Sequence, residues 1–503
     1  MKNLKFIQLI IFLFCIISCR QNREERGVEL FNTQCASCHV APNLQDLPKD
    51  IWQNSVLPDM GARMGIYDPN YSPLKGLSFS EQEQIVKSGI YTRKAVISLE
   101  DWVLLKEYII KSAPDSLEEI PKLNITKKMP LFTSNAINLD SIPGSSICFI
   151  DINDDGRIIT ANLSGNISSY NYHEKIVNPI NSFESPVTSY TKKDSLEYFT
   201  TIGFLNPSEL SNGGINQRFR NSTKQIGSNL HRPVHTTVYD FDKDGKDEFL
   251  VSEFGHLTGV LSMWKQDDNE DYKKTVLLAQ PGIVRTVVQD MNADGKVDIV
   301  LMSTQGNEGV SILYQEDNLS FSGEQVLRFS PVYGSSWFEL LDYDGDGYQD
   351  IVTVNGDNAD KSYVHKPYHG LRIHINDGKN NFEEKYFYPM HGTTRFVAED
   401  FDEDGDVDFG VLSSFPDYEN NPNLSFIYLK NINSTNYKFE SFILEEPSIG
   451  RWLLLDAGDI DNDGDKDIVL SAFSYYFTPI PEDLDKKWTA SNIDLLVLEN
   501  TMK

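Results

Sequence analysis

One acidic loop recurs along the chain, and its residue types and spacing could bind a metal ion. It is clearest at Asp342, Asp344, Asp346 and Asp350, with Gly347 at the sixth position. Carboxylates at positions 1, 3, 5 and 9 of a tight turn supply the hard oxygen ligands that Ca²⁺ prefers, and the glycine lets the backbone reverse. An EF-hand begins similarly but closes with Glu at position 12 between two helices. This loop closes with Asp at position 9 between short β-type runs, so the pattern predicts a calcium loop in a β-hairpin.

Four further copies of the loop have the same spacing, which predicts about five bound Ca²⁺ ions in all. Their expected ligands are Asp240, Asp242, Asp244 and Glu248; Asp290, Asn292, Asp294 and Asp298; Asp400, Asp402, Asp404 and Asp408; and Asp459, Asp461, Asp463 and Asp467. A decayed copy begins at Asp151, where Ile159 replaces the closing ligand and argues against metal binding.

The spacing of the loops indicates a repeat architecture. Successive first positions, counted from Asp151, are 89, 50, 52, 58 and 59 residues apart. Four short strands with their turns fill one such period. The long first interval leaves room for one unit without a metal loop, with 198–202 as a candidate strand. Six visible units and one silent unit predict a seven-bladed β-propeller.

The loops and their spacing resemble the FG-GAP or VCBS repeats of integrin-type propellers, over roughly residues 129–503. The resemblance implies an all-β propeller at 131–503 but no single function, because such propellers bind many kinds of ligand. A lone strand is expected at 131–139, and the last repeat ends after its third strand, near 494–498. We expect these two segments to complete one blade together, which removes exposed strand edges.

A second chemical motif is the C-x-x-C-H sequence formed by Cys35, Cys38 and His39. Two thiols at this spacing form thioethers to haem c, and the adjoining histidine supplies an iron ligand. The alternative is a disulfide or a redox-active cysteine pair.

The sequence around this motif indicates a small all-α domain. A short helix is expected around Gly27 and Phe31, and a second helix, carrying Trp102 and Tyr108, after Ser98 as its cap. The pattern resembles class I cytochrome c, which implies a cytochrome domain at 27–114. A polar, proline-bearing linker is expected at 115–130.

The second axial ligand of such a haem would be a methionine. No histidine follows His39 until His173, which leaves Met60 and Met64 within this domain. The residues alone leave both open, because two methionines four apart also suit core packing on a helix. Segment 56–60 resembles the methionine-bearing segment of haem domains fused to such propellers, which implies Met60 as the ligand.

The first 18 residues are typical of an export signal. Two lysines precede an apolar run at 6–17, which is too short to span a membrane comfortably. A small residue followed by Cys19 resembles the lipobox of bacterial lipoproteins, which implies lipid attachment at Cys19 and a tether at 19–26. An uncleaved anchor and ordinary cleavage are the alternatives. The prediction is a protein outside the cytoplasm, held by lipid on a bacterial membrane, at the periplasmic or the cell surface.

The side chains five residues before the first aspartate of each loop suggest a role in ligand binding. They are His235, Arg285, Trp337, Arg395 and, if a bulge is allowed, Arg451. Such positions begin the inner strands of a propeller and surround one mouth of its channel, so they could bind a ligand. Salt bridges to the acidic loops and packing within the channel are the alternatives. Inserts at 355–370 and 414–423 are expected to rim this face.

The overall charge and the absence of common catalytic motifs limit the classes of function that fit the sequence. The chain has 45 basic and 74 acidic residues, which argues against nucleic acid as a partner. It lacks a nucleophile elbow, an H-E-x-x-H motif and a phosphate loop, which favours an electron-transfer or binding protein over a stand-alone enzyme but leaves enzymatic activity open.

These features predict a lipid-anchored cytochrome that exchanges electrons with a redox partner protein, while the propeller recognises a protein or carbohydrate ligand. In the alternative, the propeller is itself catalytic, as a dehydrogenase that reduces the haem or as a polysaccharide-cleaving enzyme. A third possibility is an adhesion module with a redox-sensing haem.

Overall fold

The computed structural model describes residues 23–126, 129–359, 362–444, 447–475 and 478–503. The chain divides into two compact units, the first of which ends at Glu118. The predicted export signal and Cys19 lie outside the described residues. Within the described part of the chain, no helix is long and apolar enough to cross a membrane.

The first unit is helical. After a helix at residues 23–34, its elements are η1 (Cys35–Ser37), η2 (Leu44–Asp46), α2 (Lys49–Ile51), the π-helical turn η3 (Trp52–Val56), α3 (Leu57–Arg63), α4 (Phe79–Ser88) and α5 (Leu99–Ser112). Side-chain caps explain where the two longest named helices begin. The Ser98 hydroxyl accepts a hydrogen bond from the Asp101 amide at the start of α5, and a Ser78–Glu81 capping box begins α4.

The first helix packs closely against α5. A Cβ on Gly27 would lie 2.7 Å from the Cβ of Tyr108, so only glycine permits this approach, and the Phe31 and Tyr108 rings are 6.1 Å apart. Trp102 of α5 packs in the same way against Gly61 of α3. The residues expected to frame the C-x-x-C-H motif therefore do meet in one small core.

The second unit is a seven-bladed β-propeller in which each blade is an antiparallel sheet. Its blades are β3 (Ile147–Ile152), β4 (Ile158–Asn162), β5 (Asn166–Asn171) and β6 (Ile176–Ser182); β7 (Val187–Lys193), β8 (Leu196–Thr201), β9 (Gly213–Phe219) and β10 (Ser222–Leu230); β11 (Pro233–Tyr239), β12 (Glu248–Glu253), β13 (Val260–Gln266) and β14 (Tyr272–Leu278); β15 (Ile283–Gln289), β16 (Asp298–Ser303), β17 (Gly309–Gln315) and β18 (Phe321–Arg328); β19 (Ser335–Leu341), β20 (Asp350–Asn355), β21 (Gly370–Asn376) and β22 (Phe382–Pro389); β23 (Thr393–Glu399), β24 (Asp408–Ser413), β25 (Phe426–Asn433) and β26 (Lys438–Ile443); and β27 (Trp452–Gly458), β28 (Asp467–Ala472), β29 (Leu495–Asn500) and β2 (Phe132–Ile137).

The first strands of the blades form the inner ring. Each contacts the first strand of the next blade, and β27 contacts β3 to close the circle. Behind them, every residue of β12, β16, β20, β24 and β28 is buried. The silent unit between the first two acidic loops is the blade β7–β10, as the long interval predicted.

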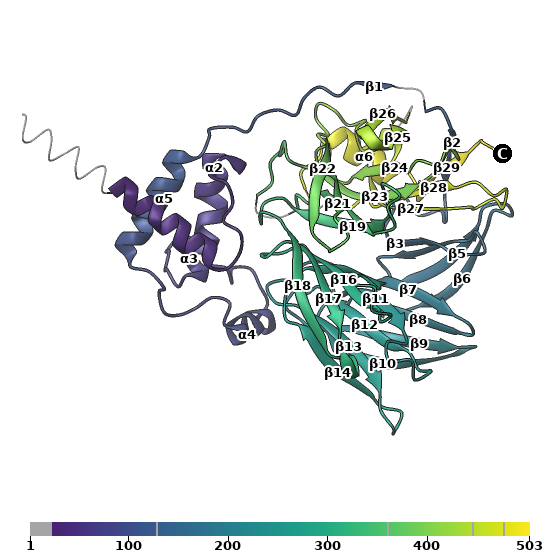
Figure 1. Ribbon diagram of the computed structural model, residues 1–503, viewed down its shortest axis with the longest axis horizontal. Coiled ribbons are helices and arrows are strands. Elements are labelled where there is room, and N and C mark those ends of the chain that lie inside the picture. The colour runs from purple at the N-terminus through teal and green to yellow at the C-terminus, as the bar shows by residue number, and fades with distance from the viewer. Residues whose placement is uncertain (1–22, 127–128, 360–361, 445–446, 476–477) are drawn as a thin grey trace, which may run out of the picture. The chain divides into compact units, whose positions relative to one another are not determined.

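The last blade is completed from the other end of the propeller. Strand β2 pairs antiparallel with β29, from Phe132 opposite Asn500 to Ile137 opposite Leu495, and Figure 1 shows the two side by side. The expected closure is therefore present. The linker, however, is not free of structure, because β1 (Ile125–Thr126) pairs in parallel with β26.

We predict that Phe132→Ala lowers the stability of the propeller by about 2 kcal/mol. The Phe132 ring packs edge-on against Phe401 and Tyr428, at 5.6 and 5.3 Å, and the substitution would leave a cavity there. Urea unfolding gives the difference. The control is Ser134→Ala at an exposed position of the same strand, which should change stability by less than about 0.5 kcal/mol. Equal effects of the two substitutions would contradict this closure.

Candidate functional site

Five acidic loops, each named here by its first residue, join the first and second strands of their blades. In the Asp240 loop, the Asp240 carboxylate accepts hydrogen bonds from the Asp244 and Gly245 amides at 3.1 and 2.9 Å. The same pair of bonds recurs in the Asp290, Asp342, Asp400 and Asp459 loops. The sixth-position glycines have φ between 85° and 98°, a left-handed conformation that favours glycine.

The closing carboxylate of every loop is fully buried, and it holds strands together as well as facing the loop. Asp350, for example, accepts the amides of Tyr343 and Asn376 at 2.9 and 2.8 Å, which ties the loop to the third strand of the blade. Burial raises the pKa of Asp350 to about 6 and the pKa values of Asp408 and Asp467 to about 7. A cation in the loop would favour the ionised form of these groups.

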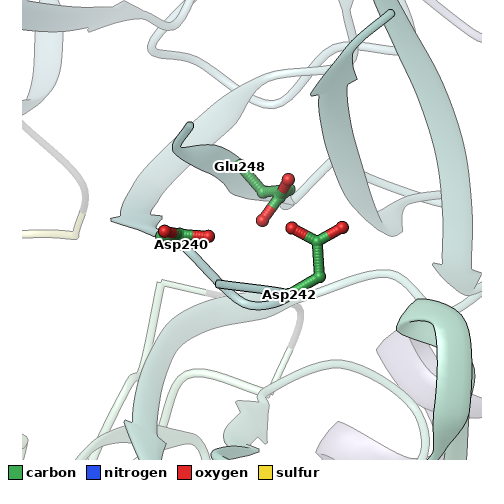
Figure 2. A group of neighbouring side chains, drawn as sticks. All are labelled: Asp240, Asp242 and Glu248. Atoms are coloured by element: carbon green, nitrogen blue, oxygen red, sulfur yellow. The ribbon is translucent and has the colours of Figure 1, made fainter. Parts of the chain in front are cut away.

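Carboxylates converge in four of the five loops. Ligand atoms within 4.8 Å of one another come from Asp240, Asp242 and Glu248; Asp342, Asp344 and Asp350; Asp400, Asp402 and Asp404; and Asp459, Asp461 and Asp467. Figure 2 shows the first group pointing into one space. The Asp290 loop keeps the fold, but its third position is the uncharged Asn292, and within the described residues no three of its acidic groups converge to this distance.

The decayed copy is not a loop of this type. Asp151 lies inside β3 opposite Ile159, and the turn follows it, closed by a 3.1 Å hydrogen bond from the Asn153 amide to the Arg157 carbonyl. The ladder places Asp151 facing the channel, at the level of Glu339, and not at a first-ligand position.

In the first unit, the C-x-x-C-H residues follow the first helix directly. Cys35 and Cys38 are free thiols, and burial raises the pKa of Cys35 to about 11. The His39 Nδ1 lies 2.8 Å from the Val40 carbonyl oxygen. A carbonyl only accepts, so Nδ1 carries the proton and Nε2 keeps a free lone pair, the form in which imidazole binds a metal.

The helix that carries Met60 is held by its neighbour Asp59. The buried Asp59 carboxylate accepts hydrogen bonds from the Tyr71 and Tyr91 hydroxyls at 2.7 and 3.0 Å, and Arg63 pairs with it at 2.9 Å. This network fixes α3 to the chain that follows it, and with it the half-buried Met60 and Met64. Nothing in the sequence pattern singled out Asp59, because both tyrosines lie in irregular segments.

A cavity of about 460 Å³ also lies in this unit, lined by Ser72, Pro73, Leu74, Ile85, Val86, Gly89, Tyr91, Thr92 and Arg93. Through Tyr91 it adjoins the Asp59 network. The C-x-x-C-H residues do not line it.

The inner strands share a bulge near their start, and the residue after the bulge stands at one level in all seven blades. These residues are Phe149, Ser189, His235, Arg285, Trp337, Arg395 and Leu454. Four of the five expected residues thus share a level. Arg451 does not, because β27 begins only at Trp452 and the register gives this level to Leu454. Arg451 is buried and donates to the Tyr475 carbonyl.

Two arginines flank one tryptophan at this level. The guanidinium carbons of Arg285 and Arg395 lie 4.3 and 4.2 Å from the Trp337 ring centroid. Arg285 also pairs with Glu339, which accepts from the Trp337 indole at 2.8 Å. Arg395 donates only to backbone carbonyls, those of Ser336 and Thr394, both at 3.0 Å. Arg285 is therefore salt-bridged, although to an inner-strand residue and not to an acidic loop, while Arg395 forms no ion pair within the described residues.

The charges along the channel change the pKa values of their neighbours. Burial, followed by the charge of Arg285, lowers the pKa of His235 to about 3, and the same two causes lower that of Arg395 to about 10. One level further in, burial and the charge of Asp151 raise the pKa of Asp456 to about 7. The channel thus has a cationic and aromatic level next to an acidic level.

Long inserts between second and third strands lie at the end of the propeller where the inner strands begin. The His365 and His391 rings are 5.0 Å apart, and His391 bonds to the Lys366 carbonyl, which joins the first insert to the start of the next blade. The third insert, which the sequence did not single out, contains α6 (Glu482–Ala490). Its Trp488 packs edge-on against Tyr418 of the second insert, at 5.3 Å.

Comparison with known proteins bears on the propeller. Among curated proteins, none matches this chain. Residues 290–353 match the family described as FG-GAP-like repeat. The match begins at Asp290, includes the whole of the Asp342 loop and ends within β20. This segment is therefore an FG-GAP-like repeat within a seven-bladed propeller, in agreement with the resemblance of the loops.

Proposed function

We propose that this protein is an exported c-type cytochrome, lipid-anchored through Cys19, whose first unit transfers electrons through a covalently attached haem. The observation that carries the proposal is the hydrogen bond from the His39 Nδ1 to the Val40 carbonyl. It fixes the tautomer that leaves Nε2 free for iron, the arrangement in which metal-binding histidines are usually held. The free thiols of Cys35 and Cys38 stand beside it in the sequence that haem attachment requires.

The residues of this unit would have distinct roles. When bound, the haem supplies a one-electron couple. Cys35 and Cys38 hold it, and His39 and Met60 provide the axial ligands. Asp59, fixed by Tyr71 and Tyr91, positions the helix that carries Met60.

The surface of this unit supports a prosthetic group or partner that is bound by apolar contact. Tyr67, Phe79, Val96 and Leu99 are 86, 81, 61 and 66% exposed. We propose that these side chains form one surface, because contiguous exposed apolar patches mark interaction sites. A haem edge and a docked redox protein both suit such a surface.

We predict that the mature protein, made in a host that attaches haem c, retains haem after denaturation and has a low-spin His/Met spectrum. Met60→Ala should abolish the methionine-to-iron charge-transfer band, and the matched Met64→Ala should leave it. The reverse result would make Met64 the ligand.

Cysteine variants test the covalent attachment of the haem. Replacing both Cys35 and Cys38 by serine should abolish covalent attachment, whereas Cys148→Ser, at a cysteine in β3, should not change it. A protein that keeps no haem under any of these conditions would overturn the proposal.

The propeller loops are proposed to bind Ca²⁺. Their oxygen donor sets fit a hard cation, and buried carboxylates with raised pKa values are ionised readily only beside a positive charge. Ion binding would lock each hairpin and position the inner strands.

Excess chelator is therefore expected to lower the melting temperature of the propeller, because it removes ions bound only by the folded state. Circular dichroism of the strands gives the melting curve. The haem spectrum of the first unit should be unchanged, which makes it the internal control. An unchanged propeller melting curve would contradict calcium in these loops.

A second function is favoured by one observation, the unpaired charge of Arg395 beside Trp337. We propose that this channel mouth binds an anionic group, such as a sugar acid or an acidic loop of the partner protein. Arg285 adds a second guanidinium, and Glu339 is the carboxylate that pairs with it. The charges of Glu339 and Asp357 act on Arg395, but it forms no ion pair with either within the described residues, which leaves its guanidinium available to an anion.

Fluorescence titration with uronic-acid oligosaccharides, and with sulfate as the minimal anion, tests this function, because Trp337 should report binding. Arg395→Gln should weaken binding about tenfold or more, as for loss of a charge-assisted hydrogen bond. The control is Arg220→Gln, which removes an exposed arginine that lies over Phe219 elsewhere on the propeller. Equal affinities of the two variants would place the ligand elsewhere.

A further inference from the structure

One position on the third strand of each blade faces the closing carboxylate of that blade's acidic loop. Each ladder ends one residue before this point, and continuing its register by one residue brings the position opposite the closing carboxylate in all five blades that carry a loop. In chain order its occupants are Lys265, Tyr314, Ile375, Lys430 and Glu499. The loops have nearly the same ligands, yet this position carries a positive, a neutral or a negative side chain.

Lys265 reaches into the Asp240 loop. Its Nζ lies 2.5 Å from Asp242, 3.0 Å from Asp244 and 3.0 Å from Glu248. An ammonium group has three N–H donors, and each of them meets a different carboxylate of the loop. Two of the three, Asp242 and Glu248, belong to the group that converges in Figure 2.

Lys430 occupies the same position but does not fill its loop. It pairs with Asp402, whose other oxygen, Oδ1, is buried and has no hydrogen-bond partner in the described structure. In the Asp459 loop the position is held by Glu499, which adds negative charge near Asp461. The Asp240 loop therefore needs an external cation least, and the Asp459 loop needs one most.

We infer that Lys265 is a built-in counter-ion that takes the place of Ca²⁺ in the Asp240 loop, so that this loop is closed without metal while the others bind it. This inference rests on the proposal that the loops bind Ca²⁺. An ammonium and a calcium ion cannot share one cage, because their charges repel at this distance. Calcium could enter only if Lys265 left and gave up three charge-assisted hydrogen bonds.

The cost of that displacement sets the size of the effect. Lys265 would give up three hydrogen bonds between charged groups. The loss of two of them alone would weaken Ca²⁺ binding about a hundredfold. We therefore expect the Asp240 loop to bind Ca²⁺ at least about a hundredfold more weakly than the same loop with Lys265 removed.

The test is the number of Ca²⁺ ions that the full chain retains, measured by elemental analysis after dialysis and by calorimetric titration. Lys265→Met keeps the length of the side chain and removes its charge. This variant should retain one more ion than the wild type. Ile375→Met changes the equivalent position of the Asp342 loop without changing charge, and it should retain the wild-type number.

A second measurement does not depend on counting. Without calcium, Lys265→Met leaves three carboxylates uncompensated, so in chelator it should melt below Ile375→Met, and added Ca²⁺ should restore it by a larger shift. Equal, non-zero ion counts in the wild type and Lys265→Met would overturn the role of Lys265. No bound calcium in either protein would overturn the calcium proposal itself, together with this inference.

Discussion

Repulsion between carboxylates folded into one tight turn is the constraint on which the propeller depends. Two arrangements in each loop reduce this repulsion. The carboxylate of the first aspartate accepts hydrogen bonds from backbone amides of the turn, as Asp240 does from Asp244 and Gly245. The closing carboxylate is buried and bound to amides of neighbouring strands, as Asp350 is with Tyr343 and Asn376. The loop is thereby part of the blade's core, and the charge that remains has to be met by a cation or by a lysine.

This arrangement connects the loops to the channel. The loop closes one end of the inner strand, and the residue after the bulge stands near its other end, so a strand fixed at the loop also fixes the level of Arg285, Trp337 and Arg395. The position of the cationic level is therefore set by hydrogen bonds some distance away. Variation in the inserts can then change the rim without moving the inner ring.

Features that depend on local residue patterns could be predicted from the sequence. Each loop is a pattern within one hairpin, and the spacing between loops gives the period and the silent blade. The closure by β2 follows from the number of strands in each repeat. Features that depend on register could not. Arg451 was expected at the cationic level only by allowing a three-residue bulge, but the ladder of β27 has no such extra bulge and gives that level to Leu454. Lys265 lies 17 residues from Glu248, and only the pairing of β12 with β13 brings them together.

The same distinction applies to the first unit. The C-x-x-C-H motif and the helices that carry Gly27 and Tyr108 follow from short patterns and from helix caps, whereas the contact between the two residues is seen only in the structure. The network around Asp59 joins residues 12 and 32 positions apart through segments with no regular structure, so no periodicity could reveal it. Anchoring of the methionine-bearing helix is thus a property of the tertiary structure alone.

Closure of the ring by β2 has a consequence for the order in which the protein matures. Leu139 and Asp494, which bond where β2 meets the last blade, are 355 residues apart, and contacts of such separation form late and slowly. The first unit, in contrast, has its whole core once α5 has been synthesised. The first unit can therefore complete its fold before β2 pairs with β29. Until β29 is in place, the propeller is an open arc whose unpaired strand edges favour mispairing with other chains.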